Sequence, residues 1–173
     1  PSFLIQVSGT GFYVPVTITD NPQPAAAALG APVVFNVSAT GTELIKYQWR
    51  KNGASISGAT ASTYTVPAAA ATHAGTYTVV VSNPDGSKTS AGASLTVVDT
   101  AVKVIALPTG GTFQTSPPVT GAVTGYLWKQ NGGPMPSDPR YTGWAGKTLK
   151  IAKLIESDAG DYSCDVITAG GRL

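Results

Sequence analysis

Two side chains have the chemistry of nucleophilic catalysis, the single histidine His73 and the single cysteine Cys164. A thiol nucleophile needs its base within hydrogen-bond reach. The two residues lie in opposite halves of the chain, which the repeat described below assigns to different domains. The sequence therefore offers no catalytic pair, and we expect that the protein is not an enzyme.

His73 stands just before an Ala-Gly-x-Tyr motif, Ala74–Tyr77. Asp158 holds the same place before a second copy of the motif, Ala159–Tyr162. A polar side chain at such a corner bonds the backbone amides of the turn. We therefore expect His73 to cap a turn rather than to act in catalysis or to bind a metal.

Four carboxylates lie close together near the C-terminus, Glu156, Asp158, Asp161 and Asp165. Oxygen ligands of this kind bind Ca²⁺. Because alternation along a strand places some of them on opposite faces, a solvated surface and turn capping are favoured over a weak calcium site. We predict no metal site and no cofactor.

The residues considered so far lie in two copies of a tandem sequence repeat. A Tyr-x-Trp strand ending in Asn-Gly occurs at Tyr47–Gly53 and again at Tyr126–Gly132, each followed by its Ala-Gly-x-Tyr corner. The two tryptophans are 79 residues apart and the two corner tyrosines 85. A real repeat holds a nearly constant offset, so the second copy is the first with six extra residues in one loop.

Apolar and polar residues alternate along the chain, as in strands with one buried face. Two such faces are formed by Val33, Phe35 and Val37 and by Tyr77, Val79 and Val81. The predicted fold is all-β. We divide the chain into an N-terminal strand and linker at 1–13, a first domain at 14–98 and a second domain at 99–173.

The first copy, over about Thr17–Val98, resembles the immunoglobulin-like domains found in tandem in large bacterial surface and secreted proteins. A weaker resemblance covers about Ala101–Leu173. Together, the two resemblances imply two tandem immunoglobulin-like Greek-key β-sandwiches. In that family the tryptophan lies in the core against a cystine, and the tyrosine hydroxyl closes a corner. The resemblance therefore implies core roles for four residues, Trp49, Trp128, Tyr77 and Tyr162.

The chain departs from that family at the cystine. Val37 and Val79 stand where the first copy's cysteines would fall, so an apolar contact is expected there. Cys164 is kept in the second copy, but the facing strand Phe113–Val119 contains no cysteine. Cys164 is then either a free thiol that packs as a small hydrophobe or one half of an intermolecular bridge.

Both ends of the chain bear on assembly. The sequence stops at Arg172–Leu173, where we expect the final strand of the second sandwich to begin. It opens at Pro1 without a leader, as expected of a processed chain or of a piece of a longer one. The segment Ser2–Val7 is similar to the closing strand Ala93–Val98. Either the chain belongs to a long array, or its N-terminal strand, through Phe3, Leu4, Ile5 and Val7, completes the second sandwich of another copy and builds a filament.

The inserted loop, Pro134 to Trp144, is the candidate recognition surface. Tyr141 and Trp144 are expected to offer flat faces to a sugar or a protein, and Arg140 a fork of donors. The alternative is that Trp144 folds back and merely anchors the loop.

Composition limits the partners. Only 12% of residues are charged and the net charge is +2, without a basic cluster, so nucleic acid is not expected. The sequence contains no run of eighteen apolar residues, so it predicts no membrane-spanning helix. The expected partners are further copies, neighbouring immunoglobulin-like domains, or a surface glycan or protein. The expected location is extracellular or on a cell surface, and the alternative is the surface of a phage virion.

Overall fold

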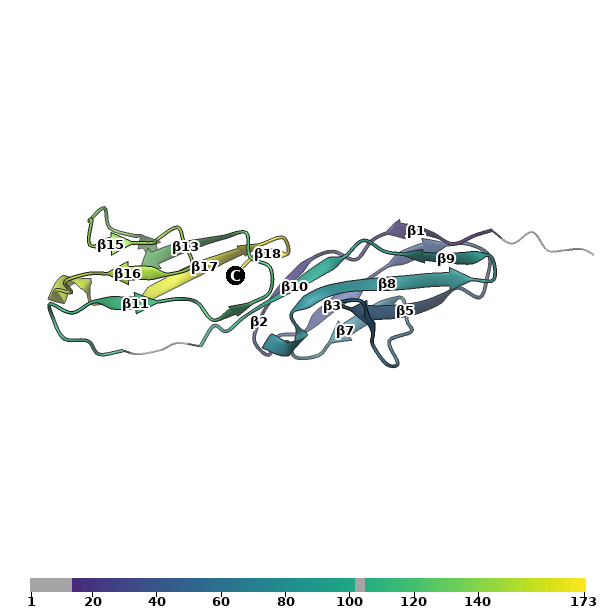
Figure 1. The fold of residues 1–173 in the computed structure, drawn as a ribbon, viewed down its shortest axis with the longest axis horizontal. Helices are drawn as coiled ribbons and strands as arrows, with labels where there is room; N and C mark the ends of the chain where they lie inside the picture. Colours follow the sequence, from purple (N-terminus) through teal and green to yellow (C-terminus); the bar gives the residue numbers. More distant parts are fainter. Residues whose placement is uncertain (1–13, 102–104) are drawn as a thin grey trace, which may run out of the picture.

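The computed structural model describes residues 14–101 and 105–173, which form two β-sandwiches lying end to end (Figure 1). The predicted donor strand, Phe3, Leu4, Ile5 and Val7, lies outside the described residues. In the part of the chain that is described, no helix is long and apolar enough to cross a membrane. The all-β prediction is confirmed.

The first sandwich has a main sheet built around the long strand β8 (Gly75–Asn83). Its other strands from the first sandwich are β2 (Ala25–Ala28), β10 (Ala93–Val98), β5 (Lys46–Lys51), β6 (Ala54–Ser55) and β9 (Gly86–Thr89). Two strand pairs lie opposite, β3 (Val33–Asn36) with β7 (Thr63–Val66) and β1 (Thr17–Asp20) with β4 (Ser38–Thr40). All pairings are antiparallel except that of β2 with β10.

The core of the first sandwich is aromatic. Trp49 and Tyr77 are buried, and the rings of Phe35 and Tyr77 stack with centroids 4.7 Å apart. Val37 and Val79 are buried in the same cluster. Both valines therefore lie in the apolar core, and their direct contact in place of a cystine stays a prediction.

The second sandwich repeats the plan with fewer strands. One sheet has the order β14 (Gly133–Pro134), β13 (Gly125–Gln130), β17 (Tyr162–Thr168) and β18 (Gly171–Arg172). The other has the order β11 (Phe113–Thr115), β16 (Leu149–Ile151) and β15 (Tyr141–Thr142). Trp128, Leu149 and Ile151 are buried between the two sheets.

The hairpin after each tryptophan strand takes the conformation that its sequence demands. Asn52 and Gly53 have φ of 49° and 85°, and Asn131 and Gly132 have φ of 49° and 75°. Positive φ at both central residues defines the hairpin turn for which Asn-Gly is the preferred sequence. The same turn therefore fixes the strand register in both sandwiches.

The corner before each tyrosine also repeats. A single 3₁₀ turn precedes it in both copies, η1 (Ala71–His73) and η2 (Glu156–Asp158). The hydroxyl of Tyr77 donates to the carbonyl of His73 at 2.7 Å, and that of Tyr162 donates to the carbonyl of Asp158 at 2.6 Å. Both tyrosine corners are confirmed.

The junction between the sandwiches corrects one prediction. Residues Phe113–Val119 do not form one strand, because Pro117 and Pro118 lack the N–H that a continuous ladder needs. The segment splits there, and β12 (Val119–Thr120) pairs with β10 of the first sandwich. The hydroxyl of the buried Thr96 also donates to the carbonyl of Ala122 at 2.7 Å. The two sandwiches therefore share hydrogen bonds across their boundary.

Candidate functional site

The inserted loop is held by an ion-pair network centred on Arg140. Its guanidinium donates to the carboxylate of Asp158 from Nη1 at 2.6 Å and from Nη2 at 3.1 Å. The same side chain bonds Asp138 from Nε at 3.0 Å and from Nη2 at 2.8 Å. These bonds hold the pKa of Asp158 at about 2 and raise that of Arg140 above its usual range. Arg140 thus fastens the loop to the corner of the sandwich.

Tyr141 points inward from the same loop. Its side chain is 6% exposed, and its hydroxyl donates to Asp158 Oδ1 at 2.5 Å. Burial, together with this bond, raises the pKa of Tyr141. The expectation that Tyr141 offers a flat face and Arg140 a free fork of donors is corrected, because the ring is covered and both carboxylates occupy the guanidinium.

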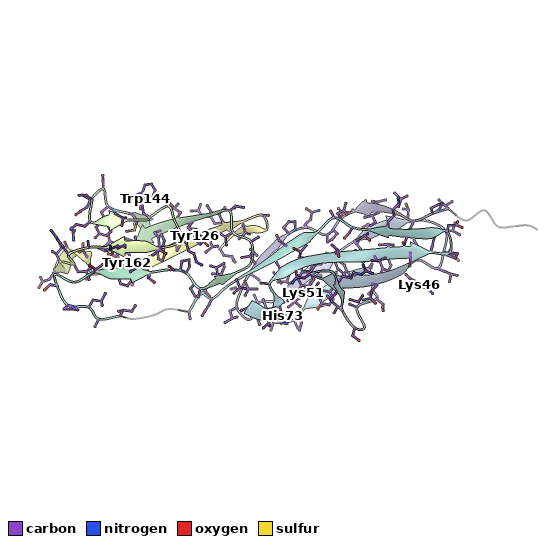
Figure 2. All side chains as sticks on the ribbon, viewed as in Figure 1. Lys46, Lys51, His73, Tyr126, Trp144 and Tyr162 are labelled. Atoms are coloured by element: carbon purple, nitrogen blue, oxygen red, sulfur yellow. The ribbon has the colours of Figure 1, made fainter. Side chains whose placement is uncertain are left out.

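Trp144 is the one member of the predicted set with an open face. It is 50% exposed, and its carbonyl accepts from the backbone N–H of Trp128 at 2.9 Å. Ala59 makes the same bond to Trp49 in the first sandwich, so Trp144 and Ala59 are equivalent positions. Figure 2 shows Trp144 at the edge of the second sandwich. Its role in recognition stays a prediction.

The four acidic residues do not form one cluster. Asp158 is buried, which corrects the expectation of a solvated surface there, and it caps its turn by accepting from the N–H of Ile155 at 2.9 Å. Asp165 is paired with Lys129 at 2.8 Å and with Arg172, which lowers its pKa. Over residues 14–101 and 105–173, no group of three or more potential metal ligands is found.

His73 has the capping role predicted for it. Its Nδ1 accepts from the backbone N–H of Ala70 at 3.0 Å. Figure 2 places it at the end of the first sandwich, far along the molecule from Tyr162 of the second. Cys164 lies two residues from Tyr162, so the structure does not bring the histidine and the cysteine together.

An open strand edge is the most distinctive feature of the second sandwich. In the first sandwich, β8 is paired along its length by β9 and β10. The equivalent strand β17 is paired on that side only at Ile167 and Thr168 by β18 and at Val166 by Leu173. Within the described residues, no strand covers the edge from Tyr162 to Asp165.

A groove of about 1050 Å³ runs along this edge, and we call it the acceptor groove. Its lining includes the consecutive residues Asp158–Cys164 and also Leu173. The apolar side chains of Phe113, Trp128, Ile151 and Leu154 also line it. Ile105 and Leu107, both substantially exposed, also line it.

Cys164 lines the acceptor groove as a free thiol. It packs against the core cluster of Trp128, and this burial raises its pKa to about 11. A thiol with a raised pKa is a poor nucleophile at neutral pH. Its position matches the prediction of a small side chain that packs in the core.

Two facing sheets, a buried tryptophan in each and a tyrosine corner in each decide the architecture. The fold is immunoglobulin-like. Residues 15–97 match the family model of the immunoglobulin domain. No curated protein matches the chain in sequence.

Solved structures with immunoglobulin-like domains in tandem are similar to this chain. Domains 1 to 4 of Sidekick-1 match with a TM-score of 0.53, 19% identity, and coverage of 90% of this chain and 43% of theirs. An I-band fragment of titin matches with a TM-score of 0.49, 23% identity, and coverage of 92% and 62%. The chain thus spans less than two thirds of either structure. At these identities the likeness concerns the fold alone.

Proposed function

We propose that the chain is a non-enzymatic structural and adhesive module, from an extracellular or cell-surface array of immunoglobulin-like domains or a filament of such units. Its mechanism is geometric, because sandwiches in series hold their two ends apart. The observation that supports this most directly is the pairing of β12 with β10, which extends the sheet of one sandwich by a strand from the next. A spacer needs such a joint, since a free linker would let the domains fold back.

The joint can be tested by loosening it at one glycine. A Cβ at Gly121 would lie 2.8 Å from the carbonyl oxygen of Leu95 and 2.8 Å from Thr96 Cα, so Gly121→Ala should push β12 away from β10. Gly110→Ala is the matched control, because Gly110 also has positive φ but open space around it. Small-angle X-ray scattering should show a broader distance distribution for Gly121→Ala alone. Identical profiles for all three proteins would contradict the spacer proposal.

We further propose that the filament form assembles by strand donation from residues 2–7. The open edge of β17 supports this, because unpaired N–H and C=O groups beside an apolar groove are a template for another strand. Sedimentation velocity should then show concentration-dependent species above the 17.5 kDa monomer. Deleting residues 2–7 should abolish them. A monodisperse monomer at all concentrations would refute assembly by this route.

A second candidate function is recognition of a host-surface glycan by a virion decoration or tail protein. The half-exposed indole of Trp144, on a loop that is longer than its counterpart in the first sandwich, favours it, since aromatic rings offer large apolar faces for contact. Trp144→Ala should abolish retention on immobilised glycans and leave the melting temperature unchanged. Leu44→Ala, at another exposed apolar residue, is the control. Lost stability with unchanged retention would make Trp144 an anchor of its loop.

A further inference from the structure

We propose that the outward side of the main sheet in the first sandwich binds an acidic polysaccharide, with Arg50 and Lys46 as the cations that recognise it. This inference rests on the adhesive role proposed above, and it names the surface and the class of ligand. It depends neither on the joint at β12 nor on the indole of Trp144.

The register of the strands defines this surface, which we call the outer face. Trp49 pairs with Val79 and Tyr47 with Val81, and both valines are buried in the core. Because successive side chains of a strand point to opposite sides of the sheet, the residues between these point away from the core. The outer face therefore carries Lys46, Gln48 and Arg50 of β5 beside Ser82, Val80 and Thr78 of β8.

The main sheet carries no negative charge of its own. None of its strands, β12 included, contains Asp or Glu. Over residues 14–101 and 105–173, neither Arg50 nor Lys46 takes part in an ion pair. The outer face is therefore positively charged without an internal counterion.

The second sandwich neutralises the equivalent cation. The repeat places Lys129 of β13 at the position of Arg50, and Asp165 of β17 at the position of Val80. Lys129 and Asp165 form an ion pair at 2.8 Å. Valine at position 80 leaves Arg50 without this internal partner, so its charge is available to an external anion.

Arg50 is packed against its neighbours. The residue is half-buried, and its Nε atom is fully covered. Partial burial reduces the screening of its charge by salt, and a guanidinium bonds a carboxylate through two parallel N–H groups. We therefore expect Arg50 to contribute more to binding than the exposed Lys46.

The spacing of the two cations favours a polymeric ligand. Lys46 and Arg50 are four residues apart on β5, which corresponds to about 13 Å of strand. A small anion cannot bond both side chains, whereas a chain with repeated acidic groups can. Two contacts to one ligand also raise its overall affinity.

The other side chains of the outer face favour a sugar over a protein. Ser87 and Thr89 of β9 lie opposite Ser82 and Val80, so they continue the outer face. Their hydroxyls, like those of β8, both donate and accept hydrogen bonds. Val80 is the one apolar side chain at the outward positions of β5, β8 and β9. Protein interfaces, by contrast, have an apolar centre enriched in aromatic residues.

The comparison of the two sandwiches supplies the test. Val80→Asp places a carboxylate where Asp165 lies in the second sandwich, so Arg50 should pair internally and the affinity for the polysaccharide should fall about tenfold. Val80→Asn has the same shape without the charge, and should bind as the parent chain does. Surface plasmon resonance on immobilised polygalacturonate and dextran sulfate, with neutral dextran as the reference, measures these affinities.

Two further variants separate the outer face from net charge. Lys46→Gln, at an exposed position, should weaken binding about threefold. Lys150→Gln removes the same charge from an exposed position on β16 of the second sandwich, and should leave the affinity unchanged. Circular dichroism checks that each variant is folded.

Equal affinities for the parent chain and a folded Val80→Asp would overturn the proposal, as would equal losses for Lys46→Gln and Lys150→Gln. Binding to poly-glutamate as tight as that to polygalacturonate would overturn the sugar in favour of an acidic peptide. Binding to only one of the two acidic polymers would support the outer face and identify carboxylate or sulfate as its ligand. Failure of this proposal would leave the spacer standing, because the scattering test of Gly121→Ala is independent of the outer face.

Discussion

Arg140 and Asp158 form a bidentate ion pair that joins the inserted loop to the tyrosine corner of the second sandwich. Asp158 is 5% exposed and also accepts from the hydroxyl of Tyr141 and from the N–H of Ile155. One carboxylate therefore receives bonds from two residues of the loop, Arg140 and Tyr141, and from the start of the 3₁₀ turn. Loop and corner are expected to unfold together.

We predict that Arg140→Met is strongly destabilising. It leaves the buried carboxylate of Asp158 without its cation, and breaking such a pair costs about 3–5 kcal/mol. Urea unfolding should show a loss of this size in the free energy of unfolding. Asp138→Asn is the control, because Asp138 is the more exposed partner and exposed ion pairs contribute little to stability.

The double variant Arg140→Met with Asp158→Asn sharpens this test. It removes both charges, so it should lose less stability than Arg140→Met alone, since no buried charge is left unpaired. A loss for Arg140→Met as small as that for Asp138→Asn would contradict the network as a source of stability.

We predict that the second sandwich is sensitive to acid. The bonds from Arg140 hold the pKa of Asp158 at about 2, below its ordinary value. A lowered pKa in the folded state contributes stability that is fully present above about pH 4 and is lost as the pH falls toward 2. Unfolding midpoints measured between pH 5 and 2 should therefore decline. In Asp158→Asn this component should be absent, and an unchanged decline would assign it to other carboxylates.

Residues that repeat in both copies were predictable from the sequence, because each serves a local rule. Asn-Gly fixes a hairpin, tryptophan at strand spacing faces the core, and tyrosine after Ala-Gly closes a corner. His73 was assigned its capping role in the same way, by its alignment with Asp158.

The features that the sequence did not predict depend on contacts between segments that do not repeat. The ion pair of Arg140 joins a unique loop to a residue eighteen positions away. No sequence periodicity predicts this ion pair. The one sequence signal for it was an arginine within a proline-rich insertion. The pairing of β12 with the first sandwich was likewise not predictable, because the two prolines indicate where a strand ends but not which strand the next segment pairs with.

We predict that Tyr77→Phe weakens the first sandwich modestly. The change removes the hydroxyl that donates to the His73 carbonyl, and a hydrogen bond of this kind contributes about 0.5–1.5 kcal/mol. Burial raises the pKa of Tyr77 to about 12. Its neutral form therefore contributes stability that is present below about pH 10 and is lost as the pH rises toward 12. Alkaline unfolding followed by circular dichroism should lose this component in Tyr77→Phe and keep it in the control Tyr47→Phe.

We predict that Cys164 reacts slowly with alkylating reagents in the folded protein. Burial raises its pKa to about 11 from an ordinary value of 9, so its thiolate fraction at pH 8 is reduced about 100-fold. The alkylation rate with iodoacetamide should rise about tenfold per pH unit up to pH 11. The matched control is Ser163→Cys with Cys164→Ser, which places an exposed thiol on the preceding residue of β17. Equal rates for the two proteins at pH 8 would show that the acceptor groove does not shield the thiol, and denaturant should make the rates equal.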